Sequence, residues 1–140
     1  MNGFLLDTNI VSELIKSHPD AKVVGWIEET GEALLFLSVL TLGEIRIGIE
    51  RLNLGRRRGR LESWLKLDLR ARFRNRILPI DDRVAERWGA LSAAAAANGK
   101  PVPVIDGLLA ATAMHHDLIL VTRNTPHPAG TGVPTLNPWL

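Results

Sequence analysis

GFLLDTNIVSELIK, residues 3–16, places a short apolar run, one acidic residue and an amphipathic segment in succession. The pattern predicts a first strand at residues 3–6 and a short helix at residues 10–16, capped by Thr8 or Asn9. Asp7 then stands at the carboxyl end of the strand, where open parallel sheets bind their ligands. We therefore treat Asp7 as a candidate site residue. The simpler structural alternative is a local hydrogen bond into the turn.

The rest of the chain repeats this alternation of short apolar runs and helical patterns. Further strands are predicted at residues 34–37, 77–80, 118–121 and 133–136. Further helices are predicted at residues 21–29, 40–52, 56–73, 82–97 and 105–116. This order favours an α/β fold, a three-layer α/β/α sandwich with a mostly parallel sheet of four to five strands. With 140 residues, 46% of them apolar, and no linker or repeat, one domain over residues 1–140 is expected.

Composition excludes several classes of protein. The chain has no cysteine, which excludes disulfide staples, thiolate metal sites and cysteine nucleophiles. The first residues lack the pattern of a signal peptide, and the longest apolar stretch, residues 33–40, is far shorter than the ~20 residues that span a bilayer. We expect no contact with a membrane and a cytoplasmic location.

Positive charge is concentrated in one segment, although the net charge is only +2. Residues 51–76 contain nine arginines and Lys66 against Glu62 and Asp68, a local charge of +8, so the rest of the chain carries −6. A basic block in an otherwise acidic chain indicates an anionic partner, with nucleic acid the first candidate and an acidic protein the second. A solvated arginine-rich helix face is the structural alternative.

Two more carboxylates lie in apolar surroundings. Glu44 stands in SVLTLGEIRIG, residues 38–48, a predicted helix that is apolar on nearly every side. Such a carboxylate requires a metal, strong hydrogen bonds or a salt bridge to an arginine. Asp106 stands in IDGLLAATA, residues 105–113, in the first turn of an apolar helix, where it could also complement the helix dipole.

Asp7, Glu44 and Asp106 together form a set of hard oxygen ligands. Without cysteine and without a well-spaced histidine pair, such a set fits Mg²⁺ or Mn²⁺ and disfavours Zn²⁺. A carboxylate metal site beside a basic surface indicates phosphodiester chemistry.

Five segments resemble the PIN-domain ribonucleases, and within them the VapC-type toxins of type II toxin-antitoxin modules. They are LLDTNIVSE (residues 5–13), SVLTLGEIRIG (38–48), IDGLLAATA (105–113), LVTRN (120–124) and NPW (137–139), and the resemblance covers essentially the whole chain. It implies a PIN-like fold over residues 1–140, a homodimer, and an antitoxin protein that blocks the active site. It also implies that Asp7, Glu44 and Asp106 take the places of the family's three principal metal-site acids.

From these observations we expect a Mg²⁺-dependent endoribonuclease, with Mn²⁺ as a possible substitute. Asp7 and Asp106 would bind the metal, and Glu44 would complete the site or hold a water on the metal. The basic segment would hold the RNA backbone, and DNA would be reached only through the antitoxin.

The chain departs from the family where a fourth acid often lies. Asn124 and the pair His127-Pro128 occupy the two places where that carboxylate is found in the family. Asn124 is a supporting site residue that could offer a carbonyl oxygen, and His127 is either a substitute ligand or an ordinary loop residue. The lower negative charge predicts weak binding of any second metal.

Two rival functions remain. One is a catalytically impaired PIN-fold module that acts mainly by holding an antitoxin in an operator-bound complex. The other is a phosphotransfer enzyme of the haloacid-dehalogenase type with Asp7 as nucleophile, against which Asn9 stands, since that family has an Asp-x-Asp pair.

Other polar and aromatic residues receive structural interpretations. Asp81 or Asp82 is expected to cap a helix, and Asp117 to occupy a turn. Surface positions are expected for the acids Glu13, Glu28, Glu29 and Glu32, and core or interface positions for Trp26, Trp64 and Trp88.

Overall fold

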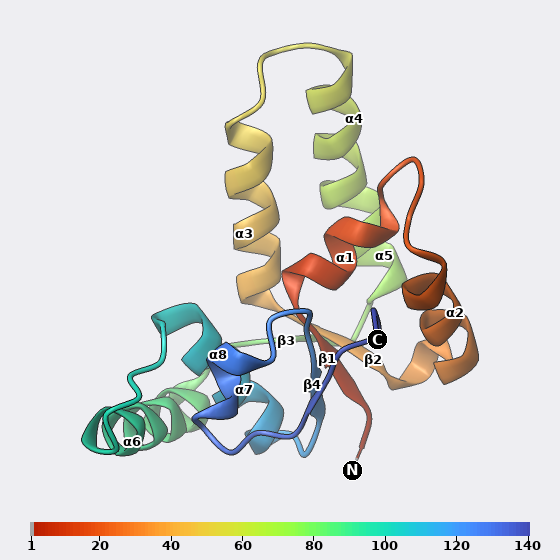
Figure 1. Cartoon of the computed structure of the whole chain (residues 1–140). Helices are drawn as coiled ribbons and strands as arrows, with labels where there is room; N and C mark the ends of the chain where they lie inside the picture. Colours follow the sequence, from red (N-terminus) through yellow and green to blue (C-terminus); the bar gives the residue numbers. More distant parts are fainter. Residues whose placement is uncertain (1) are drawn as a thin grey trace.

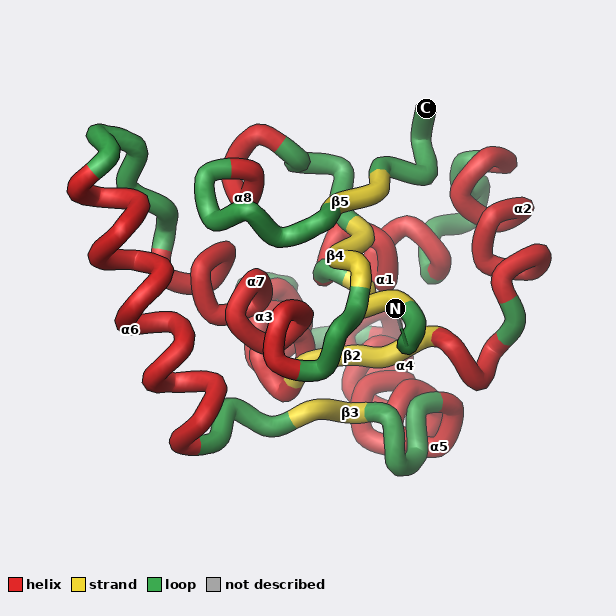
Figure 2. Tube along the Cα trace, turned by 90° about the horizontal axis from the view of Figure 1, so that it is seen from below, coloured by secondary structure: helices red, strands yellow, loops and turns green. Residues whose placement is uncertain are grey.

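A five-stranded parallel sheet forms the centre of the molecule. The computed structural model describes residues 2–140, except the side chains of His127 and Ala129. The strands are β1 (Phe4–Leu6), β2 (Leu35–Ser38), β3 (Ile77–Leu78), β4 (Ile119–Val121) and β5 (Thr135–Leu136). They lie in the order β3-β2-β1-β4-β5, and every neighbouring pair is parallel (Figure 2). The predicted mostly parallel sheet, with its fifth strand, is confirmed.

Helices connect the strands, as parallel pairing requires. They are α1 (Thr8–Leu14), α2 (Ala21–Thr30), α3 (Val39–Glu50), α4 (Arg56–Ser63), α5 (Arg70–Arg72), α6 (Asp82–Ala97), α7 (Val104–His115) and α8 (Pro126–Ala129), with the short turn η1 (Glu32–Leu34) before β2 and the π-helical turn η2 (Trp64–Leu69) between α4 and α5. Because α4, η2 and α5 follow one another without a break, the helix predicted at residues 56–73 is confirmed, with a π-helical centre. Asp81 caps α6, one of the two caps expected there.

The sheet separates two apolar cores. Successive side chains of a strand point to opposite faces, so Leu5 and Leu6 of β1 enter different cores. Leu5 packs with Leu109 and other residues of α7, while Leu6 packs with side chains of α1, α2, α3 and η2. Helix α6 packs on α7. Helices on both faces of the sheet confirm the three-layer sandwich.

Helices α3 and α4 form a hairpin that extends away from the sheet (Figure 1). Arg58 fastens the end at which the loop joins the two helices: the guanidinium donates to the Leu52 carbonyl at 3.1 Å and pairs with Glu50 at 2.6 Å and Glu62 at 3.2 Å. Arg46 of α3 lies 3.5 Å from Glu62 as well. Arg58 is only 17% exposed, so it belongs to the architecture of the hairpin.

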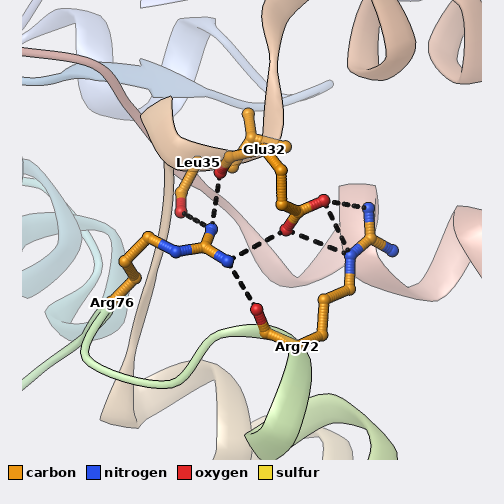
Figure 3. A network of polar contacts seen from close by, with 4 residues as sticks. All are labelled: Glu32, Leu35, Arg72 and Arg76. Carbon is orange, nitrogen blue, oxygen red and sulfur yellow. Dashed lines mark hydrogen bonds and ion pairs between the residues drawn. The ribbon is translucent and has the colours of Figure 1, made fainter.

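Arg76 joins the beginnings of β2 and β3 (Figure 3). Its guanidinium donates to the backbone carbonyls of Glu32 and Leu35, each at 2.6 Å. The Glu32 carboxylate accepts hydrogen bonds from Arg76 at 3.2 Å and from Arg72 at 3.0 Å. Glu32 is exposed, as predicted, but it also ties η1 to α5. This network holds the edge strand β3 against β2.

The helices can also be compared with the length and apolarity that a membrane-spanning helix needs. Within residues 2–140 no helix is both long enough and apolar enough to cross a bilayer.

Candidate active site

Asp7, Glu44 and Asp106 meet at the carboxyl edge of the sheet. Asp7 directly follows β1, and Glu44 lies in α3, which follows β2. Asp106 lies in the first turn of α7, and this helix precedes β4 and runs back along the sheet, so its amino end lies at the same edge. All three acids line one cavity of about 520 Å³. The topology therefore brings together residues that are far apart in the chain.

Asp7 is the cap of α1, in place of the predicted Thr8 or Asn9. Its carboxylate accepts a hydrogen bond from the Thr8 backbone N–H at 2.7 Å and another from the Thr122 hydroxyl at 2.8 Å. Asp7 directly follows the strand and keeps an extended backbone. Its short side chain therefore reaches the Thr8 amide, which has no hydrogen-bond partner within the helix. Asp7 therefore has the local structural role and also lines the cavity.

The electrostatic environment of Asp7 is unfavourable to its charge. Burial raises the pKa of Asp7 above its usual 3.8, while the hydrogen bonds from Thr122 and Thr8 oppose that rise. The negative charges of Glu44 and Asp106 raise the pKa further. The three carboxylates thus repel one another, which is the situation that a bound cation relieves.

Glu44 is held by a hydroxyl group. The Thr8 Oγ1 donates to Glu44 Oε1 at 2.6 Å, and no arginine pairs with Glu44 within the described residues. The salt-bridge alternative is therefore wrong. The expectation that Glu44 lies away from solvent, drawn from the apolar sequence of this helix, is also wrong, since Ile47 is 51% exposed and Glu44 is half-buried at the cavity. The outward side of α3 faces solvent because α3 contacts the molecule mainly through Thr41, Ile45 and Ile49.

Thr122 is a site residue that the sequence reasoning missed. Its hydroxyl donates to Asp7 Oδ2 and accepts from the Asn124 backbone N–H at 3.1 Å. Asn124 itself also lines the cavity. The available signal was the position of Thr122 directly after β4, the neighbour of β1. The side chain of His127, the other residue at a fourth-acid position, lies outside the described part of the structure.

Basic and aromatic groups form the rim of the cavity. The Arg123 guanidinium lies 5.0 Å from the ring centre of Trp139, and both residues line the cavity.

Glu13, expected on the surface, is 5% exposed, which corrects that prediction. It accepts from Lys16 Nζ and from the Asp20 backbone N–H, each at 2.9 Å, because the loop after α1 folds back over it. The hydrogen bond from Lys16, with that from Asp20, lowers the pKa of Glu13.

The donor set at the cavity fits a hard divalent cation. Carboxylate oxygens, with an amide at Asn124, are the ligands that Mg²⁺ and Mn²⁺ take in proteins. Among the described side chains, which leave out His127, no three histidine or acidic groups are close enough together to hold a metal ion. The groups that would hold such a cation are the carboxylates of Asp7, Glu44 and Asp106.

Comparisons with known proteins give one consistent family. The PIN domain family matches residues 4–128. The toxin FitB of Neisseria gonorrhoeae is 35% identical over 135 residues, which are 96% of this chain and 97% of that protein. The VapC ribonuclease Y4jK of Sinorhizobium fredii is also 35% identical, over 96% of each chain. In a solved structure of FitAB bound to an IR36 DNA fragment, the matching chain has a TM-score of 0.92 and 33% identity, with coverage of 98% of this chain and 96% of that chain.

Proposed function

The chain belongs to the PIN-domain family, and from that premise we propose that it is the toxin of a type II toxin-antitoxin module and acts as a divalent-metal-dependent endoribonuclease. The observation that carries the proposal is the common cavity of Asp7, Glu44 and Asp106 at the carboxyl edge of the sheet. A relative of similar length is named a ribonuclease, and another is named a toxin. The reaction is hydrolysis of RNA phosphodiester bonds.

Each acid has a proposed role. Asp7 and Asp106 hold Mg²⁺, or Mn²⁺ in its place, and Glu44 completes the site. When bound, the cation supplies Lewis-acid activation of water and offsets negative charge that develops on the phosphate. Thr122 orients the Asp7 carboxylate and Thr8 orients that of Glu44, both by donated hydrogen bonds. These neutral donors fix the acids and leave their charge available to the cation.

The partners follow from the relatives. Solved structures of FitAB bound to an IR36 DNA fragment and of a toxin-antitoxin complex from Klebsiella pneumoniae support a cognate antitoxin for this chain, and we propose that the chain reaches DNA only through that antitoxin. We also propose a homodimer, a single PIN domain over residues 1–140, and action in the cytoplasm, where the RNA substrate is found. Because Asn124 is neutral, a second metal ion binds weakly if at all.

A second candidate function rests on that same residue. With no carboxylate at Asn124, the chain would be a catalytically impaired module that acts mainly by binding its antitoxin in an operator-bound complex. The three retained acids at one cavity favour the ribonuclease.

Cleavage of RNA tests the ribonuclease directly. Antitoxin-free protein and its Asp7→Asn variant are incubated with total cellular RNA in Mg²⁺, in Mn²⁺ and in EDTA, and the cut ends are mapped by sequencing. We expect discrete cuts in either metal, none in EDTA, and a loss of about 100-fold or more in the variant, the scale on which loss of one transition-state-stabilising group acts.

The matched control is Asp82→Asn, because Asp82 is exposed in the first turn of α6, outside the cavity. It should cleave as the unchanged protein does. Identical behaviour of the protein and its Asp7→Asn variant in both metals would exclude the ribonuclease and support the antitoxin-binding module.

A further inference from the structure

The acidic cavity continues into a second, basic cavity. The second cavity has a volume of about 770 Å³ and shares Ser12 and Lys16 with the first. It lies between the carboxyl end of α1 and the amino-terminal half of α4, and Arg57 and Arg60 of α4 line it. One continuous surface therefore runs from the three carboxylates to these two arginines.

The structure divides the basic segment into paired and unpaired cations. Arg58, Arg72 and Arg76 hold ion pairs with Glu50, Glu62 or Glu32 that fasten the fold. Arg57 and Arg60 are exposed and make no ion pair with any residue in the described part of the chain. Other exposed cations of the segment also make no ion pair among the described residues, but Arg57 and Arg60 are the two that line the second cavity and so lie on the surface that leads to the three carboxylates.

We propose that Arg57 and Arg60 form a subsite for the phosphodiester backbone of an RNA strand whose scissile phosphate lies at the three carboxylates. The inference rests on the proposed function and deepens it. A guanidinium presents a planar fork of N–H donors that matches two phosphate oxygens, and the hydroxyls of Ser12 and Ser17 add donors to the same wall. Lys16 lies between the two cavities and is 58% exposed, although it also pairs with Glu13.

Continuity with the acidic cavity favours RNA over an acidic protein segment. A ligand that fills both cavities places one part against carboxylates and another against arginines. An RNA strand does so when a divalent cation lies between its scissile phosphate and the acids, because its next phosphates then reach the basic wall. An acidic peptide would bring further carboxylates to a site where three already repel one another.

The subsite positions RNA but does not select its sequence. Contacts to phosphate are independent of base identity, so they fix the register of the strand relative to the reacting phosphate. Their contribution to affinity comes largely from release of counterions, and it weakens as salt rises.

The salt dependence of RNA binding tests the subsite. A labelled single-stranded RNA is titrated in EDTA, so that no RNA is cleaved and the contacts to the basic wall are measured without the phosphate that a cation would hold at the acids, and binding is followed by fluorescence anisotropy at several salt concentrations. The Arg57→Gln/Arg60→Gln double variant should bind about tenfold more weakly at low salt, with a plot of log K against log salt that is shallower by about 0.7 per arginine.

The matched control removes the same charge from the same segment. Arg70 and Arg74 are exposed, make no ion pair among the described residues, and lie outside both cavities. The Arg70→Gln/Arg74→Gln variant should therefore keep the original slope. Arg57→Lys/Arg60→Lys keeps the charge and should recover most of the slope. Thermal unfolding of each variant verifies that it is folded.

The outcomes separate this inference from the proposed function. Equal slopes for the two Gln double variants would overturn the subsite, and so would unchanged RNA binding together with lost binding of an acidic peptide. A lower slope confined to the Arg57/Arg60 variant supports it. Cleavage of RNA in Mg²⁺ is scored separately, so a chain that binds through the subsite without cutting would refute the ribonuclease alone.

Discussion

Two threonine hydroxyls arrange the acids of the site at the level of single residues. Thr8 holds Glu44 and Thr122 holds Asp7, at 2.6 and 2.8 Å. An arginine in either place would fix the same carboxylate but would also offset its charge. Hydroxyl donors orient the acids and leave their combined negative charge to attract a cation.

Gly3, directly before β1, is required by its backbone conformation. Its φ is +145°, and a Cβ atom would lie 2.6 Å from the Leu34 carbonyl oxygen. We expect Gly3→Ala to lower the free energy of unfolding by about 2 kcal/mol or more, as measured by urea denaturation. In Gly25→Ala, within α2, a Cβ would meet nothing within 4 Å, and stability should rise by about 0.5–1 kcal/mol. Equal unfolding midpoints for the two variants would refute the argument.

The sequence supports the choice of acids better than the choice of their partners. Asp7, Glu44 and Asp106 were predicted because a carboxylate after a strand or in an apolar helix is unusual. Their hydrogen-bond donors depend on which strands become neighbours, and Thr122 reaches Asp7 only because β4 lies beside β1. The burial of Glu13 depends in the same way on the path of the loop after α1, which periodicity does not encode.

Elements were predicted with more success than the contacts between them. Hydrophobic periodicity located every strand and the long helices, with ends that differ by a few residues. The charge count treated residues 51–76 as one basic block, whereas the crossing of α3 and α4 commits Arg58 to the hairpin and leaves Arg57 and Arg60 free. Pairing of this kind follows from helix packing, which is a tertiary property.

The contact of η1 with α5 and β3 should depend on pH through Glu32. Burial alone would raise the pKa of Glu32, but hydrogen bonds and charges of Arg72 and Arg76 lower it below 4.5. Its contribution to stability is therefore present above pH 4.5 and is lost as the pH falls through the lowered folded-state pKa. Because Glu32 is 47% exposed, we expect less than about 1 kcal/mol.

Thermal unfolding from neutral to acid pH measures this contribution. The midpoint of the unchanged protein should fall more steeply with acidification than that of Glu32→Gln, which has no carboxylate to protonate. Glu28→Gln, an exposed change in α2, is the charge-matched control and should follow the unchanged protein. Superimposable curves for the protein and Glu32→Gln would contradict the prediction.

At the scale of the whole molecule, the site is assembled from distant parts of the chain. The acidic cavity receives Asp7 and Asn9 from the first turn after β1, Glu44 from α3, Asp106 from α7 and Trp139 from near the carboxyl end. The charges gathered there repel one another, and this repulsion opposes folding until a cation binds.

Divalent cations should therefore stabilise the whole fold. A ligand that binds only the folded chain adds about 2.7 kcal/mol to the free energy of unfolding at 100 times its dissociation constant. We expect Mg²⁺ and Mn²⁺ to raise the thermal midpoint of the protein and of Asp82→Asn, with a much smaller rise for Asp7→Asn. Equal shifts in all three proteins would show that the cation acts elsewhere.

The strand order also governs when the site can exist during synthesis. The centre of the sheet, β1, is made first, but one of its two neighbours, β4, is made among the last residues, and Thr122 directly follows it. Almost the entire chain must therefore leave the ribosome before Asp7 can accept its hydrogen bond from Thr122 and Asp106 can reach the same edge of the sheet. Chains interrupted by premature termination, or shortened by proteolysis before β4, should therefore lack the assembled acidic cavity, so the site should exist only in chains that are complete through β4.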